Sequence, residues 1–141
     1  MHFMKTTARY IYFAGARSAN NDANSYHDIL AELNKYGDLV NATNYEPEWT
    51  AWTSDERFAR MEEHFVKANI LIAEVSTPSH GVWREISYAQ HVKKIPVVCL
   101  YKADTLPSPI LQGNPDIDVF PYETLDDIKQ ILKIYFTQRS A

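Results

Sequence analysis

The sequence lacks paired cysteines, long apolar runs and clusters of basic residues. Its one cysteine, Cys99, can form neither an internal disulfide nor a metal site built on cysteine pairs. No segment reaches the roughly 20 apolar residues of a membrane span, and the first ten residues lack the apolar stretch of a signal peptide. Lys and Arg are scattered in a chain of net charge −4, unlike a nucleic-acid-binding surface. We therefore expect a soluble, cytoplasmic protein that binds neither membranes nor nucleic-acid polymers.

Motifs for metal or cofactor chemistry are missing as well. The five histidines do not have the spacing of metal ligands, and no Ser-His-Asp or Cys-His set stands out. The loop that follows Gly15 matches neither a P-loop nor a complete G-x-G-x-x-G. We expect no metal and no cofactor, and a lone carboxylate nucleophile is then the most economical chemistry.

The chain has 141 residues, 45% of them hydrophobic, which suits one compact domain over residues 1–141. Short runs rich in apolar and β-branched residues alternate along it with helical patterns. The predicted strands are 10–14, 38–42, 69–75, 95–100 and 117–120. The predicted helices begin near Ser25, Asp55, Gly81 or Val82, and Thr124. This order predicts an α/β fold with a five-stranded doubly wound parallel sheet, of the flavodoxin-like (Rossmann-like) type.

Residues at the predicted element ends indicate how the elements start and stop. Gly37 suits a left-handed helix cap, and Ser54 is predicted as the N-cap of helix 55–67 with Arg57 at its N3 position. Residues 102–116 read as a loop, since they contain three prolines and a glycine. Trp49 and Trp52 lie in a polar loop, where packing on the body or on a partner subunit is favoured over stacking on bases.

Residues 68–90 are the part of the chain around which the others are organised. A predicted buried strand ends in a polar turn, and a helix follows in which Val82, Ile86, Ala89 and Val92 share one face. The spacing places Glu85 in the first turn of this helix. A solvated helix-start glutamate and a functional carboxylate both fit that position, because the helix dipole favours negative charge there.

The loops after the first and third strands should flank one cleft, at the switch point where such sheets bind ligands. The first loop offers a glycine, an arginine and small polar residues beside a helix start, which suits a single phosphate group.

At these residues the sequence resembles the nucleoside 2-deoxyribosyltransferase-like family, and within it the 2'-deoxynucleoside 5'-monophosphate N-glycosidases. The resemblance is carried by residues 11–15 (IYFAG), by residues 73–82 (AEVSTPSHGV) and by Glu85. It implies that Glu85 is the nucleophile and that Tyr12 lies beside it and the sugar. The implied phosphate pocket contains Gly15, Arg17, Ser18, Ser79 and Gly81. A homodimer is also implied, because Ser108 matches a serine that a neighbouring subunit contributes to that pocket.

The sequence departs from the family pattern on the side of the base. Trp83 and Arg84 replace the usual Gly-Tyr pair before the nucleophile, and Ala16, Ser18 and Ala19 alter the first loop. Met61 stands where the family has an aspartate that handles the proton of the departing base, and a thioether cannot donate that proton. We expect Met61 and Trp83 to shape the base pocket.

The leading prediction is hydrolysis of the N-glycosidic bond of a nucleoside 5'-monophosphate, through a glycosyl-enzyme on Glu85. Two alternatives stay open: transfer of the deoxyribosyl group to a second base, and nucleotide binding without cleavage, as in a sensor. The sequence leaves the base undetermined, and a modified pyrimidine or nicotinamide nucleotide would also fit a reshaped pocket.

Overall fold

The structure is a computed structural model that describes residues 8–16, 23–41 and 51–139. A parallel sheet has the strand order β2-β1-β3-β4-β5, which confirms the predicted flavodoxin-like topology. The strands are β1 (Tyr10–Gly15), β2 (Asp38–Leu39), β3 (Ile70–Glu74), β4 (Val97–Lys102) and β5 (Ile117–Tyr122). The helices are α1 (Ala23–Leu33), α2 (Ser54–Lys67), α3 (His80–Tyr88), the π-helix η4 (Ala89–Lys93), α4 (Pro109–Gln112) and α5 (Leu125–Arg139).

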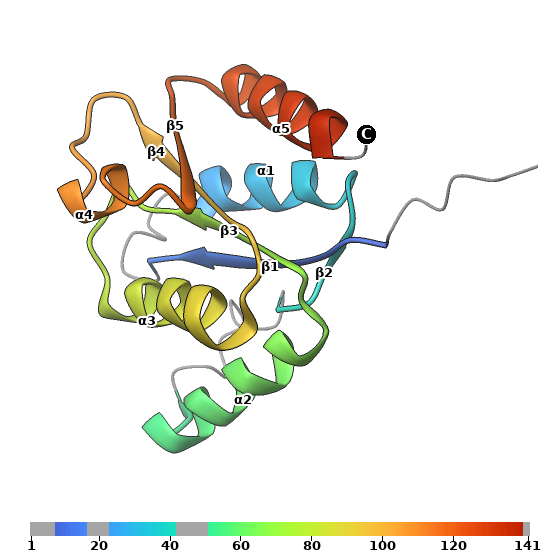
Figure 1. Cartoon of the computed structure of the whole chain (residues 1–141), viewed down its shortest axis with the longest axis vertical. Coiled ribbons are helices and arrows are strands. Elements are labelled where there is room, and N and C mark those ends of the chain that lie inside the picture. Colours follow the sequence, from blue (N-terminus) through green and yellow to red (C-terminus); the bar gives the residue numbers. More distant parts are fainter. Residues whose placement is uncertain (1–7, 17–22, 42–50, 140–141) are drawn as a thin grey trace, which may run out of the picture.

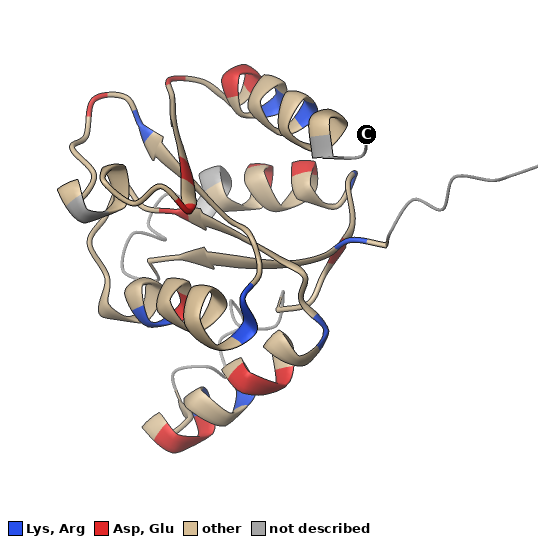
Figure 2. Ribbon diagram, in the orientation of Figure 1, with Lys and Arg blue, Asp and Glu red and all other residues tan. Residues whose placement is uncertain are grey.

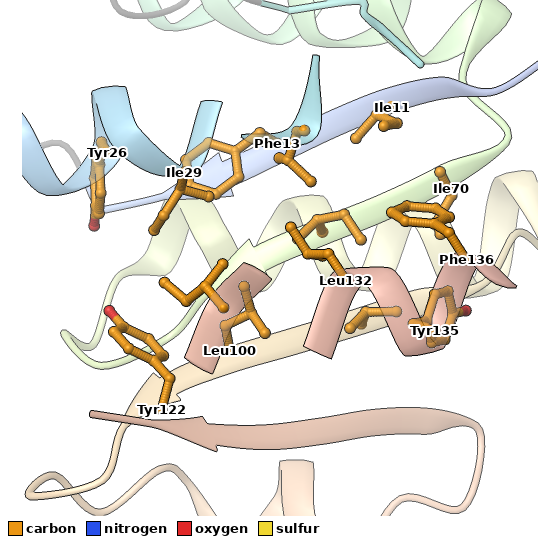
Figure 3. Close-up of a cluster of buried hydrophobic side chains, with 14 residues drawn as sticks. Ile11, Phe13, Tyr26, Ile29, Ile70, Leu100, Tyr122, Leu132, Tyr135 and Phe136 are labelled. Atoms are coloured by element: carbon orange, nitrogen blue, oxygen red, sulfur yellow. The ribbon is translucent and has the colours of Figure 1, made fainter. Parts of the chain in front are cut away.

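The sheet is covered on both faces, and each face has its own hydrophobic core. Helices α1 and α5 cover one face, while α2 and α3 lie on the other (Figure 1). Successive residues of a strand point to opposite faces, so Ile11 and Phe13 enter the core beneath α1 and α5, and Tyr12 and Ala14 enter the other core. Figure 3 shows the first core, where Leu132 and Phe136 of α5 lie over the strands. Burial of each such large side chain contributes about 1.5–3 kcal/mol.

Helix α2 begins one residue earlier than predicted. Its N-cap is Thr53, whose hydroxyl accepts a hydrogen bond from the Glu56 N–H, and the Glu56 carboxylate accepts one from the Thr53 N–H in return. These hydrogen bonds, the one from the Thr53 backbone first, lower the pKa of Glu56. The prediction of Ser54 as N-cap with Arg57 at N3 is wrong, because the reciprocal capping box requires Thr53 and Glu56.

Gly37 is not a left-handed cap, since no glycine among the described residues has a positive φ. A Cβ at Gly37 would lie 2.5 Å from the carbonyl oxygen of Arg9. The same carbonyl accepts the N–H of Asp38 at 2.9 Å. Close approach of two backbones, rather than backbone conformation, therefore demands glycine here.

Helix α3 starts at His80, with Ser79 as its N-cap, which is earlier than the predicted start at Gly81 or Val82. Glu85 lies in the second helical turn instead of the first. After Tyr88 the chain continues as the π-helix η4. Lys94 is the C-cap of this helix and has a left-handed φ of 56°. Because a π-helical turn holds more residues, the 3.6-residue spacing fails there, and Val92 is 61% exposed instead of buried with Ile86.

The remaining predictions of element position need smaller corrections. Strand β4 is displaced by two residues from the predicted 95–100, β5 extends to Tyr122, and the short helix α4 lies in the predicted loop 102–116. Strand β2 covers only the first part of the predicted 38–42. Both signs of charge occur on α2 and α5 in Figure 2. In the described parts of the chain, no helix has the length and apolarity needed to cross a membrane.

Candidate active site

A cavity of about 380 Å³ opens where the topology predicts a binding site. Gly15 ends β1 and Ser79 follows β3, and both residues line this cavity, so the end of β1 and the turn after β3 do meet there. Residues of α2 and α3 complete the walls. The lining residues are Tyr12, Gly15, Ser54, Arg57, Phe58, Met61, Ser79, Gly81, Val82, Arg84 and Glu85.

A tyrosine–glutamate pair lies in the wall of the cavity. The hydroxyl of Tyr12 donates a hydrogen bond to Oε2 of Glu85, a half-buried residue of α3. The Tyr12 ring is fully buried and stacks on Phe65 of α2, with ring centroids 4.0 Å apart and an interplanar angle of 8°. A buried ring has few rotamers open to it, so the hydroxyl is a fixed donor that orients the Glu85 carboxylate.

The start of α3 forms the wall beside Gly15. The hydroxyl of Ser79 accepts the N–H of Val82 at 3.3 Å, which caps the helix. Gly81 leaves open space, because a Cβ there would meet only the Ser79 hydroxyl, at 3.7 Å. Unpaired N–H groups and the positive end of the helix dipole make such a start suitable for an anion.

The opposite wall comes from one face of α2. Ser54, Arg57, Phe58 and Met61 have the i, i+3, i+4 and i+7 spacing that places residues on one side of a helix. Met61 was predicted to belong to the base pocket, and the structure brings it to the same cavity as Glu85. Sequence reasoning missed the other three as site residues, although their spacing from Met61 was a usable signal.

Arg84 of α3 also reaches toward this wall. Its guanidinium carbon lies 6.0 Å from the centroid of the Phe58 ring, within the range of a cation–π contact. The guanidinium group therefore lies near α2 rather than over the open start of α3.

Two other predicted site residues lie in a second, smaller hollow of about 60 Å³. Trp83 lines this hollow with Ser108, and only Ser79 and Val82 are shared with the larger cavity. The structure thus separates Trp83 from Met61, with which it was expected to form a base pocket. Adjacent residues of a helix point about 100° apart, so Trp83 and Arg84 cannot face the same side.

The predicted phosphate ligands Arg17 and Ser18 lie outside the described residues, as does Trp49. Trp52 is half-buried, and its ring lies 5.0 Å from the guanidinium carbon of Arg60. This contact is within the protein body, in agreement with the favoured interpretation of that residue.

Sequence reasoning also missed a second tyrosine–glutamate pair at the end of β3. Glu74 is 2% exposed, and its Oε2 accepts a hydrogen bond from the hydroxyl of Tyr122. The Ser76 N–H and hydroxyl donate to the same carboxylate at 2.7 and 2.9 Å. The Ser76 oxygen in turn accepts the N–H of Lys102 at 2.8 Å. This network fixes the chain just before the turn that leads to Ser79.

The pKa values of Cys99 and His64 are also shifted. Burial raises the pKa of the Cys99 thiol to about 12, so this residue is a packing element of β4. Desolvation, followed by the positive charge of Arg60, lowers the pKa of His64 on α2. The described residues contain no group of three or more His, Cys, Asp or Glu side chains that could hold a metal ion.

Known proteins are similar to this chain over most of its length. No protein-family model matches the chain. It is 33% identical over 130 residues to a protein of Syntrophotalea carbinolica assigned as 2'-deoxynucleoside 5'-phosphate N-hydrolase 1, covering 87% of this chain and 91% of that protein. A protein of Methanosarcina mazei with the same assignment is 35% identical, over 89% of this chain and 71% of its own length.

More distant relatives extend the comparison. The 5-hydroxymethyl-dUMP N-hydrolase of Tetraodon nigroviridis is 27% identical over 92% of this chain and 98% of that protein. The solved structure of a CMP N-glycosidase from Clostridium botulinum superposes with a TM-score of 0.67 at 16% identity, covering 90% of this chain and 99% of that one, which supports the fold. The resemblance drawn from residues 11–15 and 73–82 is confirmed, and the chain belongs to the 2'-deoxynucleoside 5'-phosphate N-hydrolase family.

Proposed function

We propose that the chain hydrolyses the N-glycosidic bond of a 2'-deoxynucleoside 5'-monophosphate, with Glu85 as the nucleophile. Its membership of an N-hydrolase family supports the reaction class. The observation that carries the assignment of Glu85 is its position: a half-buried carboxylate, oriented by the Tyr12 hydroxyl, in the wall of a cavity large enough for a ligand.

The proposed reaction has two steps. A carboxylate oxygen of Glu85 forms a bond to the anomeric carbon while the bond from that carbon to the base nitrogen breaks, and the bonding electron pair leaves with the base. Water then cleaves the glycosyl ester and regenerates the carboxylate, as in retaining glycosidases. Tyr12 touches the nucleophile, and its hydrogen bond holds the carboxylate in one orientation for the attack.

The phosphate is proposed to bind at the start of α3, where Ser79, Gly81 and Gly15 line the cavity. Arg17 and Ser18 are proposed to complete this pocket on the basis of the sequence resemblance alone. Glu85 lies one to two turns further along α3, so a sugar between its phosphate and its base could place the anomeric carbon near the nucleophile.

A homodimer is proposed in which Ser108 of one subunit reaches the phosphate pocket of the other. Ser108 lines the small hollow together with Leu106, which is 97% exposed. The proposed subunit contact would cover this exposed side chain. Sedimentation should give a dimeric mass at micromolar concentration, and Ser108→Ala should raise KM more than it lowers kcat. A cytoplasmic location stays a prediction from the sequence.

A second candidate function is nucleotide binding without cleavage, and Met61 is the observation that favours it. Met61 is 4% exposed in the wall where the family resemblance requires an acid. Loss of a positioned acid typically lowers a rate by about 10²–10⁴.

One experiment separates these functions. The protein is incubated with a panel of 2'-deoxynucleoside 5'-monophosphates, and the released base is measured by chromatography, with Glu85→Gln as the matched variant. Hydrolysis gives free base that Glu85→Gln does not release, whereas a transferase makes a new nucleotide when a foreign base is added. Binding in calorimetry with no base released after long incubation would favour the sensor and refute the proposed hydrolysis.

A further inference from the structure

Two arginines line the cavity and have no role in the proposed reaction. Arg57 of α2 is half-buried and Arg84 of α3 is exposed, and Glu85 is the one carboxylate among the described lining residues. The described wall therefore carries two permanent positive charges and one negative charge. Two guanidinium groups in the described wall of a partly enclosed site favour an anionic ligand.

The position of the arginines indicates which part of a nucleotide they would meet. Arg57 precedes Met61 by four residues, so the two side chains are neighbours on one face of α2. Arg84 reaches the same side, because its guanidinium carbon lies 6.0 Å from the ring centroid of Phe58. The proposed phosphate residues belong to β1 and to the start of α3, which form a different wall. The two positive charges thus lie on the side assigned to the base.

We infer that Arg57 and Arg84 select nucleotides whose base carries a negative charge, such as a carboxylate-bearing pyrimidine. The inference rests on the proposed function and names the substrate class of that same site. A guanidinium group binds a carboxylate through two parallel, charge-assisted hydrogen bonds, and a neutral base offers no charged acceptor of this kind. Selection then follows from the charge of the base and from the fork geometry of the arginines.

The same arginines compensate for the acid that Met61 cannot supply. When the glycosidic bond breaks, its electron pair stays on the base nitrogen, and the base leaves as an anion that takes a proton from water afterwards. Positive charges fixed beside the departing group stabilise this developing charge without a proton transfer at the moment of cleavage. An arginine pair thus supplies part of the leaving-group stabilisation that a positioned carboxylic acid would give.

The test compares two nucleotides of similar shape and different charge. Base release is measured for 5-carboxy-dUMP and for neutral 5-hydroxymethyl-dUMP, and the ratio of their kcat/KM values is the readout. We expect the wild-type ratio to favour the carboxylate by about 10- to 100-fold, the size of a charge-assisted hydrogen bond. The preference should decrease with added salt, since screening weakens a partly exposed ion pair.

Three variants assign the preference to the arginines. Arg57→Gln and Arg84→Gln should each lower the ratio by about tenfold, and Arg57→Lys should retain part of it. Arg60→Gln is the matched control on α2, because Arg60 is outside the cavity lining and pairs with Glu63 at 3.2 Å. It should leave the ratio unchanged. Circular dichroism checks that each variant is folded.

The outcomes separate the inference from the proposed function. If neutral nucleotides are cleaved as well as the carboxylate, and Arg57→Gln and Arg84→Gln leave the ratio unchanged, the inference is wrong and the proposed function stands. If no nucleotide loses its base, the proposed function fails. The calorimetric affinity ratio of the same two nucleotides, with the same variants, then decides whether the arginines select an anionic base.

Discussion

The sheet carries a tyrosine–glutamate pair on each of its faces, and the two pairs differ in their surroundings. In both, a tyrosine hydroxyl donates to Oε2 of the glutamate: Tyr12 of β1 to Glu85 of α3 on one face, and Tyr122 of β5 to Glu74 of β3 on the face covered by α1 and α5. Tyr122 is at one end of the core shown in Figure 3. The two pairs share their residue types, so their different surroundings must determine what each can do.

Glu74 accepts three hydrogen bonds and is buried. Tyr122 and both donors of Ser76 bind its carboxylate, and it is 2% exposed. Glu85 is half-buried and faces a cavity of about 380 Å³. A carboxylate surrounded by protein donors stabilises the fold, whereas one beside an open cavity can meet a substrate. The comparison teaches that access to a cavity, more than residue type, separates a structural pair from one placed to meet a ligand.

The largest expected effect comes from removing each carboxylate in turn. Glu85→Gln should lower base release by more than about 10³-fold with little change in thermal unfolding, because it removes the proposed nucleophile. Glu74→Gln should retain measurable base release. Equal losses of activity in the two variants, at matched folded fractions, would show that the distinction between the pairs is wrong.

A smaller effect is expected from Met61→Asp, which places a second carboxyl group beside the reactive pair. Release of a neutral base from an ordinary 2'-deoxynucleotide should rise by up to about 10²-fold, because the base can then leave protonated. The gain should be greatest at mildly acidic pH, where one of two neighbouring carboxyl groups holds a proton while the other attacks. A folded, nucleotide-binding Met61→Asp with no gain at any pH would refute the assigned role of position 61.

The hydrogen bonds to Glu74 should contribute to the free energy of unfolding. Glu74→Gln exchanges a buried acceptor for a group that also donates, beside the Ser76 donors, and should lower the free energy of unfolding by about 1–3 kcal/mol. Urea unfolding followed by circular dichroism measures this loss. Glu85→Gln is the matched control, and a larger loss of stability in that control would reverse the comparison.

The smallest expected effect is on the pH dependence of the free energy of unfolding, through His64 of α2. The pKa of His64 is lowered in the folded state by desolvation and then by Arg60, so the unfolded chain binds the proton more readily. Stability should therefore fall as the pH drops through the unfolded value of about 6.5. His64→Gln should flatten this part of the curve between about pH 7.5 and 5.5. An unchanged slope in His64→Gln would assign the effect to other groups.

The sequence predicted the central strands well, because β1, β3 and β4 are continuous apolar runs buried on both faces. The π-helix η4 was not predicted, because the sequence was compared with a 3.6-residue repeat and the residues of η4 carry no local signal of a longer turn. The start of α2 was missed by one residue, because Thr53 and Ser54 are both good caps and the reciprocal bond of Glu56 decides between them.

At the site, the order of the strands predicted that Gly15 and Ser79 would share a cavity, and the family resemblance predicted roles for Glu85 and Tyr12, which line the same cavity. The sequence could not show that Arg57 lines that cavity, because an arginine on an amphipathic helix is usually solvated. Glu74 was overlooked for the opposite reason. It ends an apolar strand, and its partner Tyr122 is 48 residues away, beyond the reach of a local pattern.

The two walls of the cavity come from different elements, and this difference determines which side chains can be exchanged. Strand ends and the start of α3 build one wall, so a substitution there disturbs the sheet topology or the helix cap. The other wall is one face of a single helix, which four side chains of α2 present. Exchanging those four side chains would reshape this wall and leave Glu85 and Tyr12 in place. The cavity-facing side chains of α2 can therefore be exchanged independently of Glu85 and Tyr12, as long as Phe65 of the same helix still stacks on the Tyr12 ring.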